Sequence, residues 1–230
     1  MNLTFKSYTM KKLLFLLMAL PLFCYSQNVV IPDSNFKAYL VRDSEINTNR
    51  DKEIQVSEAS AYGGRMDLGS RDIMSLKGIE AFTALTSLSC DSNQLTSLDI
   101  SKNTALELLV CFNNQLITLD VSKNTALTWL SCGNNKLTSL DVSKNTALIW
   151  LHCNDNQLNT LDVSKNTELD ELFCSNNQLT TLDVSKNAAL TWLYCSNNQL
   201  NTLDVSKNTA LTSLECVGNL FDCDALLKRN

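Results

Sequence analysis

The sequence predicts a solenoid of stacked short coils, curved into a horseshoe or arc, with a parallel β-sheet on its concave face. A leucine recurs every 21 residues from Leu85 to Leu211. Around it the pattern L-x-x-L-x-C-x-x-N-x-L-x-x-L-D-V-S-K-N-x-x occurs six times in full and once in part. Such a fixed period is the signature of a repeat architecture. Only two Pro, six Gly and 44% apolar residues allow each coil a packed interior.

Residues 1–26 predict a signal peptide. Lys11 and Lys12 precede an eleven-residue apolar run over 13–23, and small residues stand at 24 and 26, before a cleavage site. Met10 is an alternative start, because the signal is complete without the residues before it. Eleven apolar residues are too few to span a bilayer. We therefore expect export, to the medium, the cell surface or the periplasm, with no membrane span.

The charge balance of the mature chain excludes some classes of partner. Removing residues 1–26 takes three of the 19 Lys and Arg and none of the 24 Asp and Glu, which leaves 16 bases, 24 acids and a net charge of −8. Nucleic acid and anionic membrane both require a basic surface. Neither is an expected partner.

Residues 27–62 predict a small helical cap, which a solenoid needs to cover the apolar interior of its first coil. Asp33 or Ser34 can cap a helix, and Phe36, Tyr39 and Leu40 form its apolar stripe. Residues 63–84 follow as a degenerate capping coil. Its expected inward residues are Met66, Leu68, Ile73, Leu76 and Ile79.

Within the cap, N-T-N-R-D-K-E-I-Q-V-S-E over 47–58 is similar to the twelve-residue EF-hand calcium loop. That similarity implies Asn47, Asn49, Asp51, the carbonyl of Glu53 and Glu58 as ligands. The first position is Asn in place of Asp, however, and Lys52 stands where the loop needs Gly. The prediction is therefore either a weak calcium site or a loop that only folds the cap, with no other cofactor.

Each repeat predicts one short strand and an irregular return. In the strand L-x-x-L-x-C, positions 4 and 6 should face inward and positions 3 and 5 outward, by the two-residue period. The Asn at position 9 should bury its amide against backbone groups of its own and neighbouring coils. The eight residues L-D-V-S-K-N-x-x are too few for a helix and its connections, so irregular or 3₁₀ structure is expected on the convex side. There the Asp at position 15 and the Asn at position 19 suit tight-turn hydrogen bonds.

Seven cysteines occupy position 6. Equivalent side chains on stacked strands run parallel about 4.8 Å apart, whereas a disulfide needs Cβ atoms near 3.8 Å on converging vectors. A row of parallel thiols also cannot surround a metal ion. Buried free thiols acting as small hydrophobes are therefore favoured over disulfides and metal. The pair most suited to oxidation is Cys216 and Cys223, at the end of the array.

The repeat over 85–219 resembles the leucine-rich repeat family, whose signature is L-x-x-L-x-L-x-x-N/C-x-L. The helical cap followed by I-x-S-L-x-G-I-E-x-F-x-x-L is similar to the start of internalins, secreted bacterial leucine-rich repeat proteins. The 21-residue coil with Cys departs from the usual internalin coil of 22 with Leu or Ile. The resemblance implies recognition of proteins. Residues 220–230 are expected to form a short C-terminal cap.

The outward strand positions are where the repeats differ from one another. Position 3 carries Ser87, Leu108, Trp129, Trp150, Glu171, Trp192 and Ser213, and position 5 carries Ser89, Val110, Ser131, His152, Phe173, Tyr194 and Glu215. Outward aromatic residues have no core to fill, and such clusters mark interaction sites. The predicted ligand-binding surface is Trp129, Trp150, His152, Phe173, Trp192 and Tyr194, with Asp170 and Glu171 beside it. The alternative is that these rings only stabilise the sheet by cross-strand packing.

The expected function is therefore a non-catalytic, exported binding module that recognises a protein or, second, a glycan. Catalysis is not expected, because His152 is the single His and the cysteines of position 6 should point inward, away from substrate. The alternative function is a structural or adhesive surface component that acts by self-association.

Overall fold

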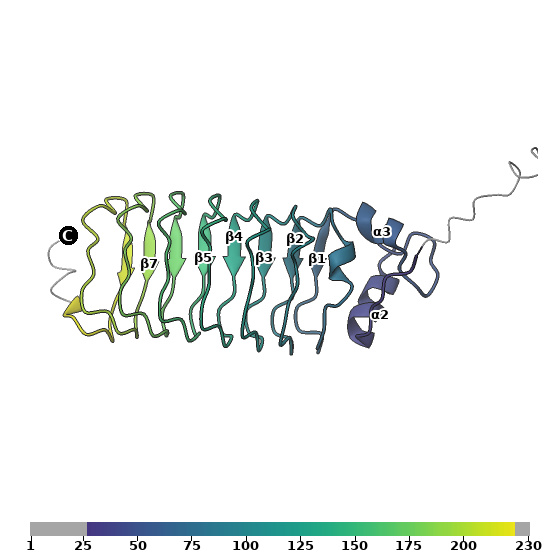
Figure 1. Ribbon diagram of the computed structural model, residues 1–230, viewed down its shortest axis with the longest axis horizontal. Coiled ribbons are helices and arrows are strands. Elements are labelled where there is room, and N and C mark those ends of the chain that lie inside the picture. The colour runs from purple at the N-terminus through teal and green to yellow at the C-terminus, as the bar shows by residue number, and fades with distance from the viewer. Residues whose placement is uncertain (1–26, 224–230) are drawn as a thin grey trace, which may run out of the picture.

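The computed structural model describes residues 27–223, and these form one elongated row of coils with helices at its N-terminal end (Figure 1). Eight parallel strands lie side by side in chain order. They are β1 (Arg65–Asp67), β2 (Ser87–Ser89), β3 (Leu108–Val110), β4 (Trp129–Ser131), β5 (Trp150–His152), β6 (Glu171–Phe173), β7 (Trp192–Tyr194) and β8 (Ser213–Glu215). The predicted signal peptide, and positions 224–230 of the predicted C-terminal cap, lie outside the described residues.

The strands are in register by whole repeats, so each position pairs with its equivalent in the next coil. Leu130 of β4 pairs with Leu151 of β5, and that leucine pairs with Leu172 of β6. These central leucines are fully buried, while the residues on either side of them face outward. The predicted alternation of the strands is confirmed. The first strand was not predicted, because its capping coil lacks the repeat pattern.

The return segments are irregular, as predicted, and the one 3₁₀ helix within residues 27–223 is η1 (Ile79–Ala81) of the capping coil. The Asp at position 15 closes a turn in each coil, as Asp141 does by accepting from the Ser143 amide at 2.9 Å. The Asn at position 19 acts differently. Asn145 is fully buried and donates to the carbonyls of Val121 and Asn124, so its bonds join two coils instead of closing its own turn.

The Asn at position 9 also joins neighbouring coils, as predicted. Asn156 donates to the Cys132 carbonyl at 3.1 Å and to the Cys153 carbonyl at 3.2 Å, and its side-chain oxygen accepts from the Leu137 amide at 3.0 Å. Parallel coils that turn sharply leave backbone groups without strand partners, and a buried group of that kind needs another partner. The side-chain amide supplies it in every full repeat.

Six position-6 cysteines are free and buried, which confirms the prediction of free thiols: Cys90, Cys111, Cys132, Cys153, Cys174 and Cys195. Burial raises the pKa of Cys132 to about 12. Such thiols are neutral and pack as small apolar groups. The seventh, Cys216, forms a disulfide with Cys223, with Cα atoms 5.6 Å apart. The expected pair is the one joined, and it ties the chain back onto the last coil.

The N-terminal cap contains α2 (Ser34–Arg42) and α3 (Val56–Ala61). The Asp33 side chain accepts from the amides of Asn35 and Phe36 and so caps α2, whose Phe36 and Leu40 are fully buried. The second helix was not predicted. Gly78 of the capping coil has φ +106°, and a Cβ there would meet Ile31 at 2.8 Å, so the cap lies directly against the coil. No helix within residues 27–223 is long and apolar enough to cross a bilayer.

Candidate functional site

The outward side of β2–β8 is called the sheet face here, and it carries the predicted ligand-binding residues. The strand register aligns Trp129, Trp150, Glu171 and Trp192 in one row and Ser131, His152, Phe173 and Tyr194 in the next. Trp192 is 43% exposed, and the other aromatic side chains are half-buried. The sequence-predicted aromatic residues therefore form one continuous surface over β4–β7.

The rings of the second row stack on one another along the array. His152 and Phe173 have ring centroids 4.2 Å apart and an interplanar angle of 8°, and Phe173 and Tyr194 are 4.5 Å apart at 8°. In the first row Trp129 meets Trp150 edge to face at 5.6 Å. Ring pairs of this kind contribute about 0.5–1.5 kcal/mol each beyond their buried area. The rings thus hold each other in fixed positions without a ligand.

A contact between an imidazole and a carboxylate lies within the aromatic surface. The His152 Nε2 atom lies 3.1 Å from the Glu171 Oε2 atom, which comes from the neighbouring strand. Burial lowers the pKa of His152, while the Glu171 carboxylate acts in the opposite direction. The two residues are 19 apart, which is one repeat minus two, so positions 5 and 3 of adjacent coils predict this contact. Asp170 lies beside the surface and accepts from the Thr191 hydroxyl.

Two features of the surface were missed by sequence reasoning. The Trp129 indole N–H is buried and has no hydrogen-bond partner among the described residues. At position 8, next to the strands, exposed asparagines with positive φ join successive coils, and Asn134 donates to Asn113 at 2.9 Å. Recurrence of Asn at this position was the available signal. The resulting row of amides forms one margin of the sheet face.

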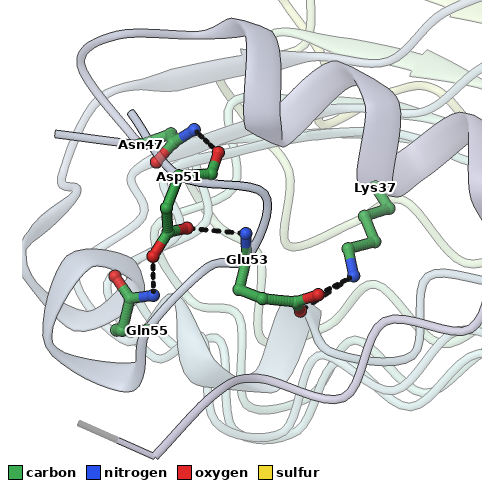
Figure 2. Close-up of polar contacts among 5 residues, drawn as sticks. All are labelled: Lys37, Asn47, Asp51, Glu53 and Gln55. Atoms are coloured by element: carbon green, nitrogen blue, oxygen red, sulfur yellow. Dashed lines mark hydrogen bonds and ion pairs between the residues drawn. The ribbon is translucent and has the colours of Figure 1, made fainter. Parts of the chain in front are cut away.

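The predicted calcium-loop residues lie together in the cap, and most of their polar atoms are hydrogen-bonded within the loop. Figure 2 shows such bonds for Asn47, Asp51 and Glu53. Asn47 donates to the Asp51 carbonyl at 2.8 Å, and the Asp51 carboxylate accepts from the Glu53 amide and the Gln55 side chain. The Glu53 side chain forms an ion pair with Lys37 at 2.7 Å. The Asn47 side-chain oxygen is buried and has no partner within residues 27–223.

Glu58 closes the other end of the loop. Its carboxylate accepts from the amides of Thr48, Asn49 and Gln55 and from the Thr48 hydroxyl. Burial raises the pKa of Glu58, but these hydrogen bonds outweigh it and lower the pKa overall. A calcium ion would have to displace N–H donors from both Asp51 and Glu58. Residues 27–223 contain no cluster of three His, Cys, Asp or Glu side chains arranged to hold a metal. The weak calcium site stays a prediction.

Glu58→Gln should lower the free energy of unfolding by about 1–3 kcal/mol without any ion, because a buried amide N–H would lose its acceptor. Glu53→Gln, which removes only a half-exposed ion pair, should cost about 0–1 kcal/mol. Thermal melts with and without calcium, on the order of 1 mM, test whether the loop binds the ion. A rise in Tm that Glu58→Gln abolishes would establish a calcium site, and an unchanged Tm would leave the loop a folding element.

Comparison with solved structures places the fold among internalins. The chain is similar to the functional domain of InlJ from Listeria monocytogenes, described as including a cysteine ladder, with 41% identity over 84% of this chain and a TM-score of 0.77. It covers 43% of the chain of that domain. An internalin C2 from the same species shares the fold at 18% identity, with a TM-score of 0.77 over 88% of this chain and 92% of that one. No family model and no curated protein matches the chain.

The repeat, the parallel sheet and the stacked asparagines are those of a leucine-rich repeat protein. Its structural neighbours are internalins, and a leucine-rich repeat protein of Leptospira interrogans has the same fold at 22% identity and a TM-score of 0.56. The cysteine row described above corresponds to the feature that the InlJ description names. The chain spans less than half of the length of the InlJ domain.

Proposed function

We propose that this chain is a non-catalytic, exported binding module whose sheet face recognises another protein. The observation that carries the proposal is the continuous aromatic surface over β4–β7, made by the two outward strand positions, both of which vary from coil to coil. Inward positions are uniform because each coil has the same interior to fill. Outward positions have no such constraint, and a cluster of Trp, Tyr and Phe on them is typical of interaction sites.

Rigidity supports the same function. Each coil is bonded to its neighbours by strand pairing and by two rows of buried asparagines, so the aromatic rings are positioned before a ligand arrives. A surface that is already ordered loses little conformational entropy on association. The similarity to internalins favours a protein ligand and export, and residues 1–26 supply the expected signal sequence.

Selection of displayed peptides tests the proposal without a known ligand. Peptides enriched on the wild type should lose at least about 100-fold in affinity for a Trp129→Ala/Trp150→Ala/Trp192→Ala variant, since buried aromatic anchors contribute about 2 kcal/mol or more each. Thr104→Ala/Thr125→Ala/Thr146→Ala, on exposed positions of the return segments, is the matched control and should bind as the wild type does.

Sedimentation across a concentration series separates foreign recognition from self-association. We expect wild type and Trp variant both to remain monomers. Concentration-dependent association of the wild type that the Trp variant lacks would instead support a structural or adhesive role. Enriched peptides that bind both proteins equally would place recognition elsewhere and overturn the proposal.

A further inference from the structure

The charges on the sheet face have one sign. In positions 2–9 of the seven coils that contain β2–β8 there is no Lys or Arg, and the acidic residues are Asp91, Glu107, Asp155, Asp170, Glu171 and Glu215. The repeat lysines are at position 18 on the return segments, where they are exposed. Two bases lie closer to the sheet than these lysines: Arg65 of β1, three strands from the first Trp, and the exposed Lys136, which follows position 9 in the coil of β4 and donates to Gln115. An acidic field of this kind attracts cationic partners and repels anionic ones.

One carboxylate lies inside the aromatic surface. The register places Glu171 directly between Trp150 and Trp192 on the neighbouring strands. Its side chain is 24% exposed and contacts His152. Burial keeps the pKa of His152 below its usual value, so near neutral pH the imidazole does not neutralise this carboxylate. A negative charge therefore remains at the centre of an apolar surface, where a cation would be favourable.

The stacking of the rings limits which shapes of partner the surface can bind. The Phe173 ring is covered on one side by His152 and on the other by Tyr194, so it presents its edge outward. A sugar ring binds an aromatic residue by lying flat on an open ring face, and stacked rings offer few such faces. Ring edges and the tops of Trp side chains are suited instead to aliphatic side chains and to the alkyl stems of Lys and Arg.

We infer that the sheet face binds a polypeptide segment in which Lys or Arg side chains alternate with apolar ones. This inference rests on the proposed function and specifies its partner. The apolar side chains contact the aromatic rows, and one basic side chain lies along Trp150 or Trp192 with its charged end at Glu171. A cation close to a Trp ring gains further from the ring's negative face.

Defined peptides of equal length test the inference: one alternating Lys and Val, one Glu and Val, and one Ser and Val. All three Trp lie on the sheet face, so intrinsic Trp fluorescence of the full chain reports binding there. The Lys peptide should bind at least about tenfold more tightly than the Ser peptide. Raising the salt from about 0.05 M to 0.5 M should weaken it, and the Glu peptide should not bind.

Glu171→Gln and Glu168→Gln form a matched pair. Both remove one negative charge, and they are three residues apart, but Glu168 is exposed outside the sheet face. Glu171→Gln should weaken the Lys peptide about tenfold, while Glu168→Gln should leave the affinity unchanged. Equal losses in the two variants would show nonspecific attraction to an acidic protein and overturn the inference.

The inference and the proposed function fail in different ways. If displayed-peptide selection yields face-specific peptides without Lys or Arg, the charge preference is wrong and the binding function stands. If the Lys peptide binds the triple Trp variant as tightly as the wild type, the sheet face is not the site. Self-association driven by the exposed lysines of a second copy would appear in sedimentation as salt-sensitive oligomers that Glu171→Gln weakens, and that result would replace the peptide partner.

Discussion

Asn156→Ala should lower the free energy of unfolding by about 2–4 kcal/mol, although the side chain is buried and belongs to no expected ligand-binding surface. Its side-chain oxygen is the acceptor of the Leu137 amide. Without it that buried N–H has no partner, which costs about 1–3 kcal/mol. The Cys132 and Cys153 carbonyls each keep a second donor, from Asn135 and Asn177. The loss at the carbonyls is therefore smaller than the loss at the amide.

Two further variants separate the donor from the acceptor. Asn156→Asp retains an oxygen for the Leu137 amide but turns a second oxygen toward the carbonyls of Cys132, Cys153 and Asn154. It should therefore destabilise more than Ala at neutral pH. Gln157→Ala, at the exposed neighbouring position, should change stability by less than about 0.5 kcal/mol. Urea unfolding followed by circular dichroism measures all three. If Asn156→Ala leaves the free energy of unfolding unchanged, the row of asparagines is not what joins the coils.

The repeat predicted most of the fold because its period carries two kinds of information. The alternation of apolar residues in L-x-x-L-x-C determines which strand residues face inward, and the constant length of 21 determines the register. Both can be read from the sequence because every coil repeats the same pattern. The cap and the capping coil depart from the repeat, so the helix α3 of the cap and the strand β1 of the capping coil were not predicted.

The asparagines at position 19 show what a single repeat cannot indicate. Their polarity and their place in a return segment suggested a local turn. Asn166 instead donates to carbonyls 21 and 24 residues earlier, which lie in the preceding coil. A long-range partner of this kind appears only once two coils are stacked. The aromatic surface was predictable by contrast, because outward position follows from strand alternation within one coil.

The row of buried cysteines at position 6 leaves little space for a larger side chain, so a substitution there should have a large effect on stability. Cys153 is fully buried, and its equivalents Cys132 and Cys174 occupy the same place in the coils on either side. A larger side chain at 153 therefore has little room to move along the array. Cys153→Leu should destabilise the protein by about 1–3 kcal/mol through overpacking. Cys153→Ala, which removes the sulfur and leaves a small cavity, should cost about 1–2 kcal/mol.

The order of the variants distinguishes size from chemistry as the reason for cysteine. If the coil interior selects a small apolar group, Cys153→Val should be the least damaging change and Leu the most, because added volume decides the cost. Burial holds the pKa of this thiol well above its usual value, so it is a poor nucleophile in the folded chain. Urea unfolding of the three variants under reducing conditions measures the order. A Leu variant as stable as the wild type would show that volume does not exclude the usual leucine, and the row of thiols would then need a chemical explanation.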